Sequence, residues 1–145
     1  MSDCWQSQGD ALSCPNSSEA PAKRILIVDD SGIVRRTIRR GLERSGYVVC
    51  GEAADGVEAI TKARELKPDL VVMDLVMPGT NGIEATSVIK STMPRLQIIA
   101  FTMFEALAKS LTSKLAIASV VSKPEGLTKL VECIQSVLGP SKSGP

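Results

Sequence analysis

The 145-residue sequence contains no histidine, and this absence excludes several kinds of site. Without an imidazole the chain has no histidine metal ligand and no histidine general base. It also has no histidine of its own that could carry a phosphoryl group. Any phosphohistidine that donates a phosphoryl group to this chain would therefore have to belong to another protein.

Paired cysteines and long apolar runs are missing as well. Cys4, Cys14, Cys50 and Cys133 form no CxxC motif, which favours reduced cytosolic thiols over a disulfide framework or a cysteine metal site. The longest apolar runs have the length of a strand, too short to span a bilayer. The start, MSDCWQSQGD, has neither the basic region nor the apolar stretch of a signal peptide. We therefore expect a cytoplasmic protein.

The charge balance gives no strong preference for a polyanionic partner. The formal net charge is +1, which argues against bulk attraction to nucleic acid or to an anionic membrane. One basic cluster stands out, and it comprises Arg35, Arg36, Arg39, Arg40 and Arg44. This cluster is either a solvated helix face or a docking patch for a protein. Without aromatic stacking residues beside it, we do not expect direct nucleic-acid binding.

The chain is organised as one domain between two tails. A hydrophobic fraction of 43% is that of a globular domain. Residues 1–22 lack periodicity and are expected to form a disordered tail, and residues 140–145 a second, short tail. Between them, residues 23–139 alternate five times between a strand pattern and a helix pattern. The predicted strands are 24–28, 47–53, 69–73, 97–101 and 119–122, and the predicted helices are 32–45, 55–67, 80–92, 104–116 and 124–139.

Five strand–helix units predict an α/β fold with helices on both faces of a parallel sheet. The flavodoxin-like strand order 2-1-3-4-5 places the first and third strands side by side. Ligands of such sheets bind outside the carboxyl ends of the strands.

Reactive polar side chains follow four of the five predicted strands. Asp29 and Asp30 follow ILIV, Asp74 follows VVM, Thr102 ends IIAFT, and Lys123 follows VVS. In the predicted strand order these groups meet at one edge of the sheet. Three acids, one hydroxyl and one ammonium are the groups needed by a Mg²⁺-dependent aspartate that accepts a phosphoryl group.

Taken together, ILIVDDSG, VVMDLVMPG, the threonine of IIAFT and VVSKP make the chain resemble the receiver domain of two-component response regulators. The resemblance covers about residues 23–139, and the FTM element is similar to receivers that are often fused to helix-turn-helix outputs. It implies that Asp74 accepts a phosphoryl group from a sensor histidine kinase or a phosphotransfer protein. It also implies Mg²⁺ bound by Asp30, Asp74 and the backbone carbonyl of Val76, with Asp29 acting through water.

The resemblance implies roles for the remaining residues too. Lys123 would pair with the phosphoryl oxygens, and Thr102 would donate a hydrogen bond to them. The Lys123–Pro124 peptide would be cis. Such a domain is not a classical enzyme: it catalyses only its own phosphorylation and dephosphorylation, and it acts by docking to a downstream protein or as a homodimer.

The sequence departs from the family pattern in three places. Val120 occupies the position of the usual switch aromatic, and the preceding AIAS lacks the common glycines. Val76 and Phe104 offer no polar side chain to orient a water, so we expect slow loss of the phosphoryl group. Met103 is bulkier than the usual small residue and would narrow access for small donors.

Three other functions are weaker interpretations. A degenerate receiver would keep the pocket as a phosphorylation-independent binding module, which Val120 favours and the complete acidic site opposes. A phosphohydrolase of the aspartyl-phosphate class would need an acid two residues after Asp74, where the chain has Val76. A nucleotide or flavin site would need a glycine-rich loop after the first strand, and none is present.

Overall fold

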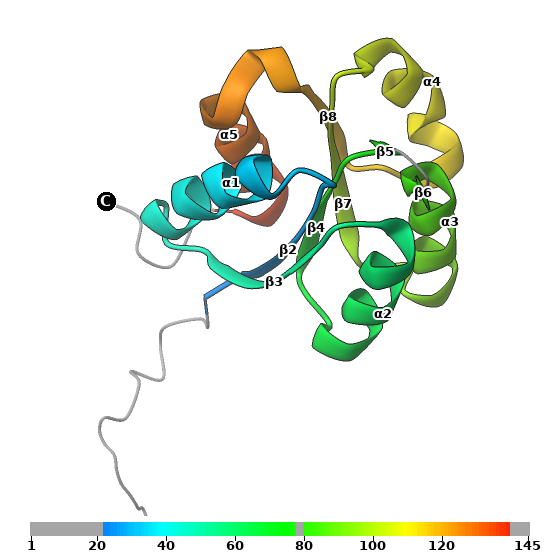
Figure 1. The fold of residues 1–145 in the computed structure, drawn as a ribbon, viewed down its shortest axis with the longest axis horizontal. Helices are drawn as coiled ribbons and strands as arrows, with labels where there is room; N and C mark the ends of the chain where they lie inside the picture. The colour runs from blue at the N-terminus through cyan, green and yellow to red at the C-terminus, as the bar shows by residue number, and fades with distance from the viewer. Residues whose placement is uncertain (1–21, 78–79, 140–145) are drawn as a thin grey trace, which may run out of the picture.

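The computed structural model describes residues 22–77 and 80–139, and its core is a five-stranded parallel sheet (Figure 1). The strands are β2 (Arg24–Val28), β3 (Val48–Ala53), β4 (Leu70–Met73), β7 (Gln97–Thr102) and β8 (Ser119–Ser122). Their order in the sheet is β3-β2-β4-β7-β8, which is 2-1-3-4-5 when the five are counted along the chain. The predicted flavodoxin-like fold is confirmed. The predicted tails lie outside the described residues, except for residue 22.

Helices cover both faces of the sheet (Figure 1). On one side lie α1 (Gly32–Arg44) and α5 (Gly126–Leu138), and on the other lie α2 (Gly56–Leu66), α3 (Gly82–Thr92) and α4 (Glu105–Leu115). A two-stranded ribbon, β5 (Val76–Met77) with β6 (Thr80–Asn81), leads from β4 to α3, and a 3₁₀ turn (Lys123–Glu125) leads from β8 to α5. Within the described ranges, no helix combines the length and the apolar character needed to cross a membrane.

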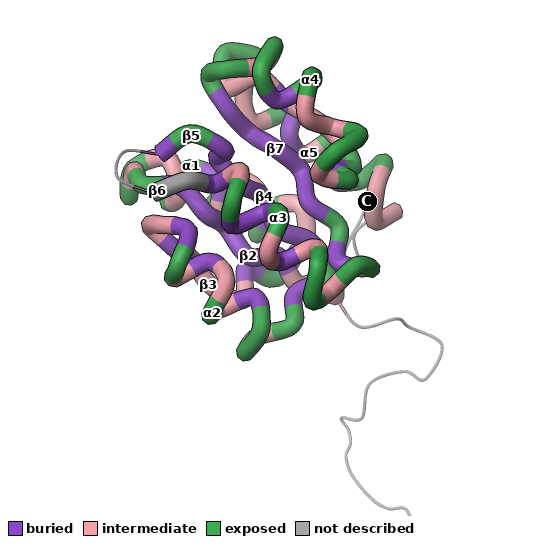
Figure 2. The backbone as a smooth tube through the Cα atoms, turned by 90° about the vertical axis from the view of Figure 1, so that its right-hand side faces the viewer, coloured by how far each residue is buried: buried purple, intermediate pink, exposed green. Residues whose placement is uncertain are grey.

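The core has two layers because successive side chains of a strand point to opposite faces. Ile25 and Ile27 of β2 pack with the cluster that includes Ile38 of α1, whereas Leu26 and Val28 pack on the opposite face. The three central strands, β2, β4 and β7, are accordingly buried along almost their whole length, while the edge strands β3 and β8 are only partly buried and the helices expose their outer sides (Figure 2). Burial on both faces explains why β4 has the wholly apolar sequence LVVM.

Side-chain caps fix where the first two helices begin. The Ser31 hydroxyl accepts from the Val34 N–H at 3.3 Å, and Asp55 Oδ1 accepts from the Glu58 N–H at 2.8 Å. Each bond satisfies an N–H that lacks an intrahelical partner. The helices therefore begin immediately beyond the sheet edge at which β2 and β3 end.

The four-residue spacing of Leu107, Leu111 and Leu115 predicts that these three leucines form the buried face of α4, but the structure buries a different residue. Leu107 is exposed, Leu111 and Leu115 are half-buried, and the small Ala108 is the buried residue. Ala108 packs in the cluster under α2 and α3, which turns Leu107 toward solvent. The first turn of α4 therefore exposes the apolar side chain of Leu107 to solvent.

Strand register brings the polar strand ends to one level. Val28, the last residue of β2, pairs with Ala53 of β3 and with Met73, the last residue of β4. The next residues, Asp29 and Asp74, therefore leave neighbouring strands at the same height. On the other side of β4, Thr102 of β7 pairs with Ser122 of β8, the residue before Lys123.

Candidate functional site

Three carboxylates gather at the carboxyl ends of β2 and β4. Asp29, Asp30 and Asp74 each offer an oxygen, and these oxygens lie within 4.8 Å of one another. Asp29 and Asp74 are buried, whereas Asp30 is exposed. Carboxylates this close repel one another, and a divalent cation with a preference for oxygen ligands relieves the repulsion. The donor set therefore fits Mg²⁺, and the exposed Asp30 gives a partly hydrated ion access.

Lys123 supplies a positive charge to the two buried acids. Its Nζ lies 2.8 Å from Asp29 Oδ2 and 3.0 Å from Asp74 Oδ2. Burial lowers the pKa of this ammonium group, but the hydrogen bonds to Asp29 and Asp74 more than offset that effect, and the net shift is upward. Lys123 is therefore protonated at neutral pH and bridges the ends of two strands.

Asp74 is held by its backbone and by its side chain. Its N–H donates to the Val28 carbonyl at 3.0 Å, and Oδ1 accepts from the Val76 N–H at 3.2 Å. Burial raises the pKa of the Asp74 carboxyl, and the lysine and the Val76 N–H only partly oppose the rise. The side chain is thus a fixed carboxylate whose ionised form depends on nearby positive charge.

Asp29 is the first residue of the turn that contains Asp29 and Asp30. Its N–H donates to the Ala53 carbonyl at 3.1 Å, and its Oδ1 accepts from the Ser31 N–H at 2.9 Å. A side-chain oxygen that accepts from the N–H two residues later closes an Asx turn. This turn directs the chain from β2 into α1 and leaves Oδ2 for Lys123.

This arrangement of acids and lysine occurs in a chain that matches a known family. The family model described as "Response regulator receiver domain" matches residues 25–135. The chain belongs to this family. It is the receiver domain of a two-component system, as the sequence motifs predict.

Relatives and solved structures agree with the family match. The chemotaxis protein CheY of Thermotoga maritima is 37% identical over 116 residues, covering 79% of this chain and 97% of CheY. Response regulator GacA of Pseudomonas viridiflava is 39% identical over 118 residues, but the match covers only 54% of GacA. A two-component response regulator of the LuxR family from Aurantimonas sp. SI85-9A1 has a TM-score of 0.75 at 40% identity, covering 86% of this chain and 91% of that one.

Thr102 of this receiver is buried at the end of β7, the strand beside β4. Its Oγ1 accepts from the Phe104 N–H at 3.1 Å. The hydroxyl hydrogen is not used in that bond, so Thr102 keeps a donor. Thr102 has no exposed surface in this structure.

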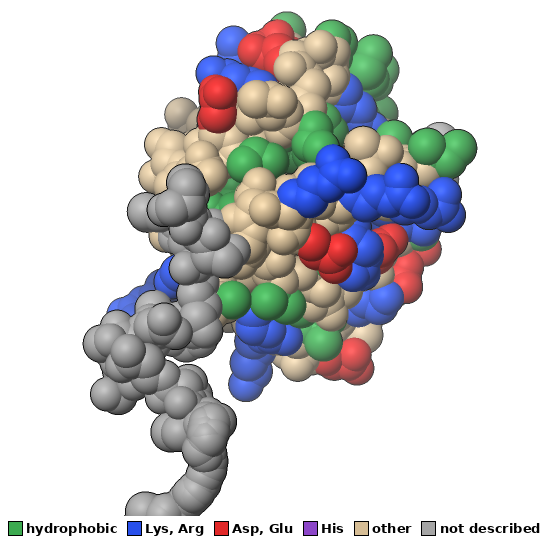
Figure 3. Space-filling model, turned by 90° about the vertical axis from the view of Figure 1, so that its left-hand side faces the viewer, with side chains coloured by type: hydrophobic (Ala, Val, Ile, Leu, Met, Phe, Trp, Pro, Cys, Tyr) green, Lys and Arg blue, Asp and Glu red, His purple; other side chains and the backbone are tan. Residues whose placement is uncertain are grey.

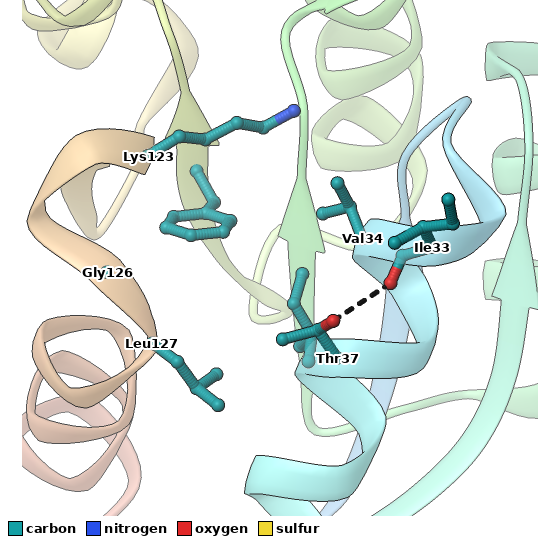
Figure 4. A pocket seen from close by; sticks show the side chains of 8 residues that line it. Ile33, Val34, Thr37, Lys123, Gly126 and Leu127 are labelled. Atoms are coloured by element: carbon teal, nitrogen blue, oxygen red, sulfur yellow. Dashed lines mark hydrogen bonds between the residues drawn. The ribbon is translucent and has the colours of Figure 1, made fainter.

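Exposed apolar side chains follow two of the strands whose ends carry the receiver's predicted site residues. Val76, Met103 and Phe104 follow β4 and β7, and they are 39%, 61% and 55% exposed. On the other side of Lys123, a cavity of about 260 Å³ lies between α1 and α5. Figure 4 shows Ile33, Val34 and Thr37 on its α1 wall, with Lys123 opposite. Lys123 is therefore shared by the acidic site and this cavity.

Three expectations from the sequence need correction or addition. No cis peptide bond occurs in the described residues, so the predicted cis Lys123–Pro124 bond is wrong. The trans bond leads into the 3₁₀ turn Lys123–Glu125, where Glu125 Oε1 accepts from the Ser122 N–H at 2.9 Å. Arg35 and Arg39 are not on a free basic face, because both pair with Glu52. Gly82, the first residue of α3, was not among the predicted residues, but it lies close to the backbone of Leu75, directly after Asp74.

Proposed function

We propose that this receiver accepts a phosphoryl group on Asp74 from the phosphohistidine of a sensor kinase or phosphotransfer protein, in a Mg²⁺-dependent reaction. The observation that supports the proposal is the position of Asp74. It is buried between two further acids and lies 3.0 Å from the ammonium nitrogen of Lys123. A carboxylate in that setting has both a reason to bind a cation and a charge partner ready for an incoming anion.

The reaction would join one Asp74 oxygen to phosphorus while the bond between phosphorus and the partner's imidazole nitrogen breaks. The imidazole leaves with the electron pair of that bond and is then protonated. Asp30, Asp74 and the Val76 carbonyl would hold the metal, and Asp29 would reach it through water. When bound, Mg²⁺ supplies charge neutralisation for the transferring phosphoryl group.

Lys123 would change partner during the reaction. Its Nζ contacts Asp29 and Asp74 before transfer. The phosphorylated side chain carries more negative charge and three acceptor oxygens, so it is a stronger partner for the ammonium group. Thr102 would donate its free hydrogen to the same oxygens. Movement of both residues would displace the segments after β7 and β8.

That displacement is the signal in this proposal. The shifted population would dock to a downstream protein or to a second copy of the chain. The domain would be catalytic only toward itself, by phosphoryl transfer to Asp74 and by slow loss of the phosphoryl group.

The test is the intact mass of the protein after incubation with acetyl phosphate or phosphoramidate, with and without Mg²⁺. Wild type should gain one phosphoryl group only with Mg²⁺, and Asp74→Asn should gain none. Asp69→Asn removes an exposed carboxylate just before β4 and should be labelled like wild type. Labelling of Asp74→Asn would overturn the assignment of the site. A wild type that binds Mg²⁺ but stays unlabelled by these donors and by a phosphorylated kinase would favour the binding-module interpretation.

A further inference from the structure

A chain of charged side chains leads from the outer side of α1 to the backbone of the acidic turn. Arg35 donates from Nε to Glu52 Oε1 at 2.9 Å and from Nη1 to the carbonyl oxygen of Asp29 at 2.6 Å. Arg39 donates from Nε to the other oxygen, Glu52 Oε2, at 2.7 Å. The side chains of Arg35 and Glu52 are only 20% and 28% exposed. The guanidinium group of Arg35 is thus fixed at two of its edges.

The Asp29 carbonyl belongs to the peptide that joins the two adjacent acids. A peptide unit is planar, so fixing its oxygen also fixes the direction in which the chain leaves toward Asp30. The peptide before Asp29 is held as well, by the bond from its N–H to the Ala53 carbonyl at 3.1 Å. The Asp30 side chain, in contrast, is exposed and makes no hydrogen bond or ion pair within the described residues. Its position therefore depends on the backbone that carries it.

We propose that Arg35, oriented by Glu52, is a positioning residue that aims Asp30 at the metal site. This inference rests on the proposed function and deepens it, because it says which residues outside the acid cluster set the affinity for Mg²⁺. Partners of metal ligands commonly have such a role, and their loss weakens metal binding on the order of 10-fold.

Direct electrostatics would give Arg35 the opposite effect. A guanidinium group near a cation site repels the cation, so deleting it should tighten Mg²⁺ binding if charge alone matters. Glu52 also limits that repulsion. Burial raises the pKa of its carboxyl, but the hydrogen bonds and charges of Arg39 and Arg35 outweigh burial and lower it, so Glu52 is ionised at neutral pH.

Isothermal titration of Mg²⁺ into wild type, Arg35→Ala, Arg35→Lys and Arg36→Ala tests the proposal. Arg36 is the matched control, because it is the next residue on α1, is exposed, and has no ion pair recorded in the described part of the chain. We expect Arg35→Ala to weaken Mg²⁺ binding on the order of 10-fold. Arg35→Lys keeps the charge, but an ammonium group cannot donate to Glu52 and to the Asp29 carbonyl with the geometry of a guanidinium group. This variant should therefore weaken Mg²⁺ binding too. Arg36→Ala should leave the affinity unchanged or slightly tighter.

Each outcome bears on a different statement. Unchanged or tighter binding in Arg35→Ala, or equal weakening in Arg35→Ala and Arg36→Ala, would overturn the positioning role. Circular dichroism at the titration temperature shows whether each variant is folded, and Arg35→Lys repeats the test with the charge retained. Wild type that neither binds Mg²⁺ nor is labelled on Asp74 would overturn the proposed function itself.

Discussion

Lys123 Nζ lies 3.0 Å from Asp74 Oδ2, although the two residues are 49 positions apart and their strands are not neighbours in the sheet. β7 lies between β4 and β8, so the lysine side chain extends across the end of that strand. It reaches Asp29, at the end of β2, as well. One ammonium group thereby joins the ends of two strands whose carboxylates would otherwise repel each other.

Replacing Lys123 with methionine should therefore affect stability and labelling in different ways. In EDTA the two buried acids lose their shared partner, and the free energy of unfolding should fall by about 2 kcal/mol. Saturating Mg²⁺ should reduce this loss, because the cation replaces the missing charge. Labelling of Asp74 should still be slower, because no ammonium group pairs with the phosphoryl oxygens. Urea unfolding and mass labelling measure the two effects.

Lys129→Met is the control for that experiment, since Lys129 is an exposed lysine of α5. It should unfold and label like wild type. A Lys123→Met protein that is as stable as wild type in EDTA would show that the bridge makes no net contribution.

The strand ends were predictable from the sequence because each apolar run stops at a charged or hydroxyl residue. Parallel strands align those stops, so Asp29, Asp74 and Lys123 could be expected at one edge before any coordinates were known. The strand ends are aligned because neighbouring strands pair in register; Val28, the last residue of β2, pairs with Met73, the last residue of β4. Strand and helix patterning, together with the flavodoxin-like strand order, is enough to predict this part of the fold.

Side-chain pairing across elements was not predictable in the same way. Helical spacing alone assigned Arg35 and Arg39 to an outer basic face, but both pair with the carboxylate of Glu52 near the end of β3. Figure 3 shows acidic side chains among the basic ones on the side of the molecule that carries α1 and α5. The exposure of Leu107 was not predictable either, because α4 packs on the core through Ala108 and Leu115 and leaves Leu107 on its outer side.

Gly82, the first residue of α3, should tolerate no larger side chain. A Cβ at this position would lie 2.8 Å from Leu75 Cα and 3.0 Å from Leu75 C, both in the backbone that follows Asp74. Gly82→Ala should therefore displace that backbone, lower the free energy of unfolding by about 1–3 kcal/mol, and slow the labelling of Asp74. Chemical denaturation and the rate of mass labelling measure these two changes.

Gly32→Ala is the matched control for stability, because a Cβ there meets only the end of the Arg35 side chain, at 3.4 Å. Alanine is the better helix former, so this variant should be as stable as wild type or more stable. Equal stability of Gly82→Ala and wild type would mean that the Leu75 backbone yields without strain.

Ala116 offers a way to stabilise the receiver away from the acidic site. It ends α4 with a φ of 55°, in the left-handed region where a Cβ is unfavourable and glycine is usual. Ala116→Gly should raise the free energy of unfolding by about 1 kcal/mol. Ala118→Gly, two residues on and without a positive φ, should instead lower it, because glycine loses more entropy on folding. Thermal unfolding of wild type and both variants measures these two changes in stability. An Ala116→Gly protein that is less stable than wild type would contradict the expectation.

The apolar residues beside the acidic site should control how long the phosphoryl group remains on Asp74. Val76 and Phe104 are 39% and 55% exposed, so polar replacements are tolerated there without opening the core. Val76→Asn or Phe104→Glu would place a hydrogen-bonding group where it can orient an attacking water, and we expect severalfold faster dephosphorylation. Val57→Asn, at an exposed position on α2, controls for the change from apolar to polar. The measurement is the decay of the phosphorylated mass after the donor is removed. If neither Val76→Asn nor Phe104→Glu decays faster than wild type and Val57→Asn, these side chains do not protect the acyl phosphate from water.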